Sequence, residues 1–195
     1  MYHRNRNRNV ATIRTQANMN MSQAIWPLAL GFTASAACMD WRSRRIPNWL
    51  TVSGLILGLA LHSLIAGWRG AAMALEGAGL ALVILAPLVL MRGLGAGDWK
   101  LMVAVGALLG PRIFLFVLFA SIMVSGLMAM ALMVQSKRVK STIRNVFVLV
   151  KGFVSFGLRA HPEISLDNPE LLKLPFGVAA AAGTWMCFLA ARWGM

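Results

Sequence analysis

Apolar residues run along this chain in long stretches that short polar connections separate. A helix that spans a membrane needs about 20 mostly apolar residues. Five stretches reach or approach this length, at residues 22–39, 49–66, 71–91, 113–135 and 174–193. The pattern predicts an all-α fold built from membrane-spanning helices.

A sixth apolar stretch, residues 101–109, is shorter and ends at Gly110-Pro111. With a helical rise of about 1.5 Å per residue, it would cover only about 18 Å even if its helix began at Asp98. We therefore expect a polytopic protein with about six transmembrane helices, of which the fourth is short and starts within the membrane. Non-helical backbone at that depth is tolerated only where protein or a water-filled cavity surrounds it. The glycine-rich segment 93–98 is for this reason a candidate site.

Two segments differ from the apolar stretches. Residues 1–21 include a run at 4–9 in which arginine alternates with asparagine, which is typical of a disordered basic tail. Met19 and Met21 are alternative starts of the chain. The connection 136–173 contains seven Lys and Arg residues. As a helix it would gather four polar side chains within a stripe of roughly 80°, namely Arg144, Lys151, Ser155 and Arg159. We expect an amphipathic helix at an anionic membrane surface, with a solvated connector as the alternative. Residues 22–193 as a whole are expected to form one membrane domain.

Composition and charge narrow the function classes. The chain is 58% hydrophobic and 13% charged, whereas a soluble domain is about half apolar and about a quarter charged. Its net charge of +13 does not indicate a nucleic-acid partner, because the bases punctuate apolar stretches instead of covering a polar folded surface. Two cysteines and three scattered histidines form no cluster of metal ligands, so we expect neither a metal nor another cofactor. His62, inside an apolar stretch, is expected to pack or to hydrogen-bond.

The distribution of Lys and Arg predicts the orientation in the membrane. The connections near 40–48, 92–100 and 136–173 together carry 12 of these residues, and the other side carries 7, including the N-terminal tail. The positive-inside rule then places these three connections in the cytoplasm. If the first apolar stretch were instead a cleaved signal peptide, residue 40 would lie outside, against this count.

The six acidic residues are distributed unevenly over the predicted spans. Three of them lie in the polar loop before the last span, at Glu163, Asp167 and Glu170. Glu76 lies about 22 Å from the cytoplasmic end of its span, near enough to the opposite interface to reach water. The remaining two, Asp40 and Asp98, share the cytoplasmic side.

A pair of carboxylates at one face of a membrane core favours acid–base chemistry. Two carboxylates that approach closely cannot both ionise, so one keeps a proton while the other can accept a proton from water. Aspartic proteases activate water in this way against a peptide carbonyl. The glycines before Asp98 would allow a substrate chain to come close. Alternatively, Asp40 and Asp98 are interfacial charges that pair with nearby cations, namely Arg42, Arg44, Arg45 and Lys100.

The residues around both acids resemble the type IV prepilin peptidases, intramembrane aspartic proteases with the second catalytic aspartate in a G-x-G-D motif. The second acid lies in Gly95-Ala96-Gly97-Asp98, followed by Trp99-Lys100-Leu101-Met102, similar to the GAGDxKLL run of that family. The first acid, Asp40, precedes Arg45-Ile46-Pro47-Asn48 and Thr51, and the last span begins Leu174-Pro175-Phe176-Gly177-Val178-Ala179, similar to a P-Y-G-V-A entry. Trp99 departs from the small aliphatic residue that is usual in the family.

The resemblance implies a short form of the family, the CpaA or TadV type found with Flp or Tad pilus systems, without an N-methyltransferase domain. It implies that Asp40 and Asp98 are catalytic and that Gly95 and Gly97 shape the substrate loop. Supporting residues around the acids would be Arg45, Asn48, Lys100 and Pro175.

The partners that the resemblance implies are prepilins and pseudopilins, membrane lipid and other pilus-assembly proteins, without nucleic acid. Each substrate would be cut after a short basic leader at the cytoplasmic face of the bacterial inner membrane, with the pilin helix beside the first and fourth spans. The alternative is a non-catalytic membrane protein, either a small transporter or a pilus assembly factor. A transporter is expected to contain inverted repeats with broken helices in both halves, and the sequence contains one glycine-interrupted segment without a counterpart.

Overall fold

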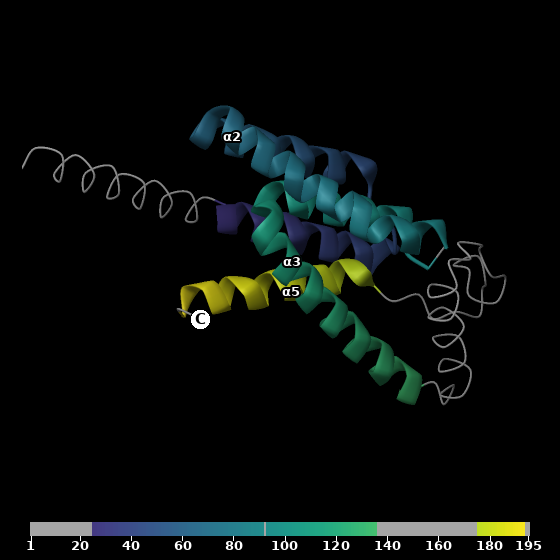
Figure 1. The fold of residues 1–195 in the computed structure, drawn as a ribbon. Helices are drawn as coiled ribbons and strands as arrows, with labels where there is room; N and C mark the ends of the chain where they lie inside the picture. Colours follow the sequence, from purple (N-terminus) through teal and green to yellow (C-terminus); the bar gives the residue numbers. More distant parts are fainter. Residues whose placement is uncertain (1–24, 92, 136–174, 194–195) are drawn as a thin grey trace, which may run out of the picture.

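The computed structural model describes residues 25–91, 93–135 and 175–193, and these residues form helices joined by short connections (Figure 1). The first helix covers residues 25–43, and we call it the N-terminal helix. It is followed by α2 (Asn48–Leu90), α3 (Ala96–Gln135) and α5 (Phe176–Arg192). The predicted all-α fold is confirmed for this part of the chain, in which no strand occurs. The tail 1–21 and the amphipathic helix expected within 136–173 lie outside the described residues.

Each of the two long helices contains one break. In α2, Ala66 (φ −127°, ψ 15°) and Gly67 (φ 57°, ψ −140°) leave the helical conformation. In α3, Gly110 adopts φ 73° and ψ 171° directly before Pro111. Glycine tolerates a positive φ and proline has no N–H to continue the helix, so both breaks follow from the local sequence.

The breaks divide α2 and α3 into two arms each, and the chain turns back at each break (Figure 1). We call residues 48–66 and 68–90 the first and second arms of α2, and residues 96–109 and 111–135 the first and second arms of α3. The sequence predicts turns near residues 69 and 112, where the stretches 49–66 and 101–109 end. The structure contains both turns, and each reverses the chain within one or two residues, at 66–67 and at Gly110.

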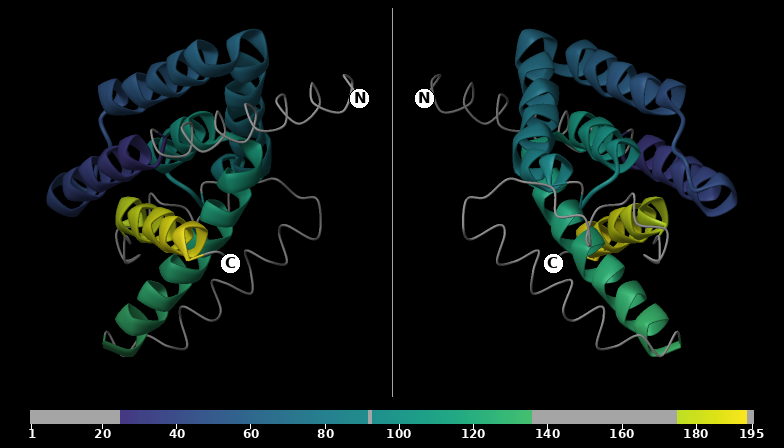
Figure 2. Two further views of the ribbon diagram at one scale, coloured as in Figure 1. Left: turned by 90° about the vertical axis from the view of Figure 1, so that its left-hand side faces the viewer. Right: turned by 90° about the vertical axis from the view of Figure 1, so that its right-hand side faces the viewer.

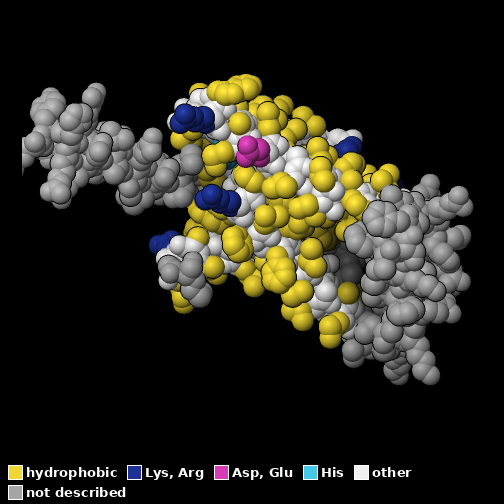
Figure 3. Space-filling model, viewed as in Figure 1, with side chains coloured by type: hydrophobic (Ala, Val, Ile, Leu, Met, Phe, Trp, Pro, Cys, Tyr) yellow, Lys and Arg dark blue, Asp and Glu magenta, His cyan; other side chains and the backbone are white. Residues whose placement is uncertain are grey.

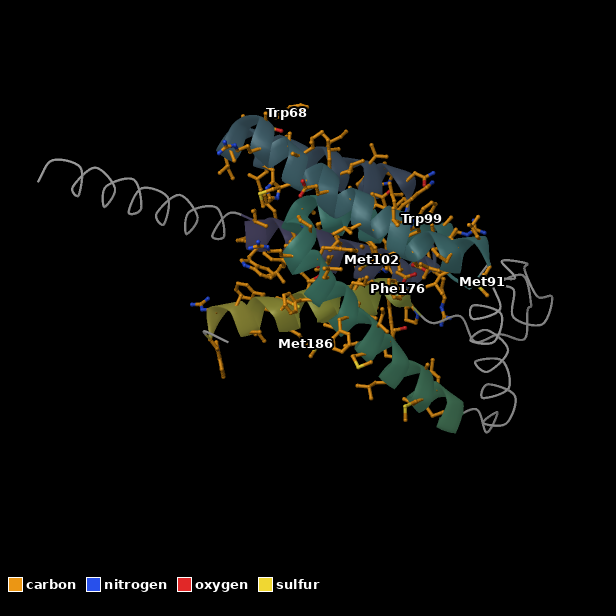
Figure 4. The ribbon with its side chains drawn as sticks, in the orientation of Figure 1. Trp68, Met91, Trp99, Met102, Phe176 and Met186 are labelled. Carbon is orange, nitrogen blue, oxygen red and sulfur yellow. The ribbon has the colours of Figure 1, made fainter. Side chains whose placement is uncertain are left out.

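The first arm of α3 lies at the centre of the bundle. Seven of its side chains are at most 3% exposed, namely Leu101, Met102, Ala104, Val105, Ala107, Leu108 and Leu109. Figure 4 shows Met102 between the surrounding helices. Close glycine contacts allow this enclosure, because a Cβ on Gly58 would lie 2.7 Å from the Ala107 backbone, and Gly77 abuts the backbone of Gly106. Small residues at such contacts let helix backbones approach closely.

The outer surface of the bundle is largely apolar. α2 and α3 are long and apolar enough to cross a membrane. Their outward side chains include Leu64 (85% exposed), Val83 (72%) and Phe116 (70%). In Figure 3 hydrophobic side chains cover most of the visible face, and Lys and Arg lie towards its ends. The first arm of α3 is only about 21 Å long, in line with the short fourth helix that the sequence predicts. That six segments cross a membrane remains a prediction.

Three connections meet at one end of the bundle. They are residues 44–47, residues 91–95 and the start of α5 at Pro175 (Figures 1 and 2). The breaks in α2 and α3 and the end of α5 lie at the opposite end, where Figure 4 shows Trp68 on the outside. The first of these two ends therefore contains the residues that the sequence marks as functional.

Candidate active site

Asp40 lies in the last turn of the N-terminal helix. The N–H of Arg44 donates to the Asp40 carbonyl at 2.9 Å, as in a helix. The helix ends there because Arg44 adopts a left-handed φ of 50°. The Ser43 hydroxyl caps the turn by donating to the Met39 carbonyl at 2.8 Å. The chain then extends to Pro47, which precedes α2. Although it is charged and near a helix end, the Asp40 side chain is only 6% exposed.

Asp98 lies in the first turn of α3. The carbonyl of Gly95 accepts the N–H of Trp99 at 3.1 Å, which starts the helix. A Cβ on Gly95 would approach Oδ2 of Asp98 to 3.0 Å, so a side chain at this position would crowd the carboxylate. A Cβ on Gly97 would make only ordinary contact with Ile46, at 3.5 Å.

This placement corrects one detail of the predicted loop. The sequence predicted non-helical backbone over 93–98, but Gly97 and Asp98 belong to α3, which begins at Ala96. Residues 93 and 94 continue from α2 by donating their N–H groups to the Leu88 carbonyl, at 2.9 and 3.2 Å. The physical reason is that glycine and aspartate are both tolerated in a first helical turn, where a carboxylate also interacts favourably with the free N–H groups.

The start of α5 completes the surroundings of Asp40. The N–H of Gly177 donates to Oδ2 of Asp40 at 2.7 Å. Pro175 is buried and precedes the helix, where its missing N–H costs no hydrogen bond. A Cβ on Gly177 would lie 2.9 Å from the Cβ of Asp40 and 3.3 Å from the Ala36 carbonyl oxygen. Gly177 therefore brings a backbone donor to the carboxylate by its lack of a side chain.

The two acids interact although 57 residues separate them in the sequence. Asp40 is close enough to Asp98 to act on it electrostatically. Gly177, from a third element, holds one of the two carboxylates. Glu76 is exposed on the second arm of α2. The arrangement has the parts of an acid–base pair, with two carboxylates from separate helices and a fixed N–H donor.

The predicted supporting residues have different surroundings. Nζ of Lys100 donates to Oδ1 of Asn48 at 2.9 Å, which joins the first turns of α3 and α2 at the surface. Arg45 is exposed, and its backbone carbonyl accepts the Ser43 hydroxyl at 3.1 Å. Of the cations considered as alternative partners of the acids, Arg44 acts electrostatically on Asp40. Lys100 is engaged with the Asn48 amide.

Trp99, Phe176 and Met91 lie towards this same end in Figure 4. The Trp99 side chain packs against the hydrophobic core, and its indole nitrogen is buried without a hydrogen-bond partner among the described residues. Over the same part of the chain, no group of three or more His, Cys, Asp or Glu residues could hold a metal ion.

His62 has the hydrogen-bonding role that the sequence suggested. Its side chain is 1% exposed, and Nε2 lies 3.0 Å from the carbonyl oxygen of Leu108. A carbonyl oxygen only accepts, so Nε2 carries the proton in this contact. Because Gly110 and Pro111 break α3 just beyond, carbonyls at the end of its first arm lack helical donors. His62 supplies one donor there.

Sequence reasoning missed Gly177 as a residue of the site. Gly177 lies within the recognised Pro175–Ala179 run, and a glycine directly after a helix start is a signal for a close approach. Arg44 was named among the cations that could pair with the acids, but the sequence gives no signal for its positive φ, which is rarely expected at arginine.

A comparison with protein families gives one match. The model of the type IV leader peptidase family matches residues 27–130, slightly more than half of the chain. The matched range contains both Asp40 and Asp98. No curated protein and no solved structure matches the chain. The chain belongs to the type IV leader peptidase family, and this membership together with the apolar α2 and α3 fits a membrane peptidase.

Proposed function

We propose that this member of the type IV leader peptidase family is an aspartic endopeptidase in which Asp40 and Asp98 cleave the leader of Flp-type prepilins and pseudopilins. The reaction takes place at the cytoplasmic face of the bacterial inner membrane, without a methyltransferase step. The observation that carries the proposal is that two carboxylates from separate helices, in the last turn of the N-terminal helix and the first turn of α3, lie at the same end of the bundle, where the N–H of Gly177 donates to Asp40. The G-x-G-D sequence at residues 95–98 supports the assignment to the aspartic type.

The chemistry follows from a shared proton. Asp40 accepts the N–H of Gly177, a contact that favours its ionised form, so Asp40 takes a proton from water. The hydroxide equivalent adds to the scissile carbonyl carbon while protonated Asp98 gives its proton to the carbonyl oxygen. Collapse of the tetrahedral intermediate returns a proton to Asp98 and transfers the proton on Asp40 to the leaving amine. Both side chains end in their starting states.

Side chains at both ends of the bundle support the proposed orientation in the membrane. The end with the two acids also carries three arginines, Arg42 in the last turn of the N-terminal helix and Arg44 and Arg45 in the connection after it. An excess of Lys and Arg favours the cytoplasmic side. Tryptophan is enriched at membrane interfaces. Trp41 (70% exposed) and Trp49 (63%) flank this connection, and Trp68 (83%) and Trp193 (78%) follow the α2 break and α5. With six segments crossing between these belts, the acids lie at the cytoplasmic boundary.

Burial limits how a substrate approaches. From Leu101 onward the first arm of α3 is enclosed, whereas Ala96 and Lys100 are exposed and Asp98 is partly exposed. A pilin helix therefore does not lie along the fourth segment. It reaches Asp98 only at the first turn of α3, with its leader junction at the same level as Asp40 in the last turn of the N-terminal helix.

Leader removal in cells tests the proposal. The chain is co-expressed with a prepilin that carries a short basic leader, and cleavage is followed by gel shift. We expect the unchanged chain to process the prepilin and both Asp40→Asn and Asp98→Asn to leave it unprocessed. Glu76→Gln is the matched control, because it also removes one carboxylate from an apolar helix but at an exposed position on α2. It is expected to process normally.

Full processing by both aspartate variants would refute an aspartic mechanism on these residues. If the unchanged chain leaves leaders intact while pilus assembly or transport depends on it, the non-catalytic alternative holds instead. Cleavage by the three variants is compared at equal protein levels in the membrane fraction, so that loss of cleavage is not confused with loss of protein.

A further inference from the structure

Arg44 has an unusual backbone conformation for its residue type. Among the described residues it is the only one other than glycine with a positive φ, at 50°. A side chain in this region crowds its own carbonyl, which is why helices that end in this way usually have glycine at the position. Strained backbone of this kind persists where the surrounding structure holds it, and it clusters at functional sites.

The turn gives Arg44 a defined relation to Asp40. Its N–H bonds to the Asp40 carbonyl at 2.9 Å, and its side chain, although exposed, acts electrostatically on the Asp40 carboxylate. Glycine at this position would end the helix with less strain but would bring no positive charge to the acid. The sequence thus has an arginine where backbone geometry alone favours glycine.

Other charged groups near Asp40 do not substitute for Arg44. α3 contributes Asp98, which is negative when ionised, and Lys100, whose ammonium bonds to Asn48. α5 contributes the Gly177 N–H, a neutral donor. Within the part of the chain that the structure describes, Arg44 is the cation that acts on Asp40.

We propose that Arg44 is a positioning residue for leader cleavage, whose guanidinium, held by the left-handed turn, keeps the negative charge of the pair on Asp40 and the proton on Asp98. The inference rests on the proposed function, because it concerns the same two carboxylates. Arg44 acts through these carboxylates. It fixes which carboxylate accepts the proton of water and which one polarises the scissile carbonyl.

Substitution to glycine separates this role from a structural one. Arg44→Gly removes both the charge and the backbone strain. With purified protein in detergent and a prepilin peptide, we expect kcat to fall about tenfold, which corresponds to about 1.4 kcal/mol, while KM is unchanged. The midpoint of thermal unfolding is expected to rise. Arg44→Lys keeps the charge and is expected to retain most of kcat.

Arg42→Gly is the matched control, because it removes the same charge from an exposed residue two positions earlier in a helical conformation. Glycine within a helix is unfavourable, so its unfolding midpoint is expected to fall while kcat is kept. Opposite shifts in stability for the same substitution at neighbouring arginines would support the assignment.

The inference is overturned if Arg44→Gly keeps the kcat of the unchanged protein, or if Arg44→Lys is as slow as Arg44→Gly. It is also overturned if Arg44→Gly loses kcat and unfolding midpoint together, since that is the result of a purely structural residue. Asp98→Asn is measured in parallel. If Asp98→Asn is inactive and Arg44→Gly is fully active, the role of Arg44 fails alone, whereas an active Asp98→Asn refutes the proposed function itself.

Discussion

Replacement of Gly177 by alanine tests the most sterically defined contact of the site. The added methyl group would lie 2.9 Å from the Cβ and 3.0 Å from Oδ2 of Asp40. The Cβ of Asp40 is bonded directly to the main chain, so no side-chain rotation relieves the first contact. To reach an ordinary carbon–carbon separation of about 3.5 Å, α5 must retreat by roughly 0.6 Å from the N-terminal helix.

That retreat would weaken the hydrogen bond to Asp40. The N–H of Gly177 now lies 2.7 Å from Oδ2, and a shift of about 0.6 Å moves it beyond the roughly 3.2 Å of a good bond. A hydrogen bond to a charged acceptor contributes about 1.5–3 kcal/mol. If this contact holds Asp40 in its reactive form, Gly177→Ala is expected to lower kcat by roughly 10- to 150-fold.

Initial rates on a prepilin peptide measure this effect, with near-UV circular dichroism to verify folding. Gly79→Ala serves as the control, because a Cβ at Gly79 would meet no atom within 4 Å. It is expected to have normal rates and equal or higher stability, since alanine is favoured over glycine in a helix. A folded Gly177→Ala protein with unchanged kcat would show that the Gly177 contact does not support catalysis.

Three further predictions concern the stability of the bundle, measured as the free energy of unfolding in mixed detergent. Gly77→Ala pushes a methyl group into the facing backbone of α3 and is expected to cost about 1–3 kcal/mol, so an unchanged value would contradict the close approach. His62→Leu removes the buried Nε2 donor from the Leu108 carbonyl, at a cost of about 1–3 kcal/mol, and His62→Gln is expected to recover part of it through its amide donor. Equal losses for both variants would argue against the hydrogen bond. Lys100→Met removes only an exposed contact with Asn48 and is expected to cost less than about 1 kcal/mol, and a larger loss would indicate a structural role for this pair.

The sequence predicted the helical regions well because length and hydropathy determine them. Over the described residues, the predicted apolar stretches coincide with the N-terminal helix, α2, α3 and α5 to within a few residues at their ends. The two predicted turns are also present, at residues 66–67 and at Gly110, because glycine and proline interrupt a helix even without a polar loop. The apolar pattern cannot separate lipid-facing from packed residues, since leucine is found at both kinds of position, as with the 85% exposed Leu64 and the fully buried Leu101.

The candidate site was likewise predicted only in part from the sequence. Asp40 and Asp98 could be singled out because acids are rare in this chain and costly in a membrane. The contact between Lys100 and Asn48 also joins two residues that the sequence had grouped. The glycine at 177 signals a close approach, but the sequence could not show that its N–H meets Asp40, because nearly every residue has a backbone N–H and only the packing of α5 selects this one.

The position of Asp98 depends on the packing of the whole first arm of α3 and not only on the helical turn that contains it. The arm is a helix of about 21 Å that is buried in the bundle, with both arms of α2 packed against it. Towards its far end, His62 donates to the Leu108 carbonyl, and two residues earlier the backbone of Gly106 meets Gly77. Sites on packed helices hold their geometry better than sites on loops. The precision of Asp98 relative to Asp40 therefore depends on contacts far from the acids, and small core residues of α2 belong to the structural basis of the site as much as the G-x-G-D motif.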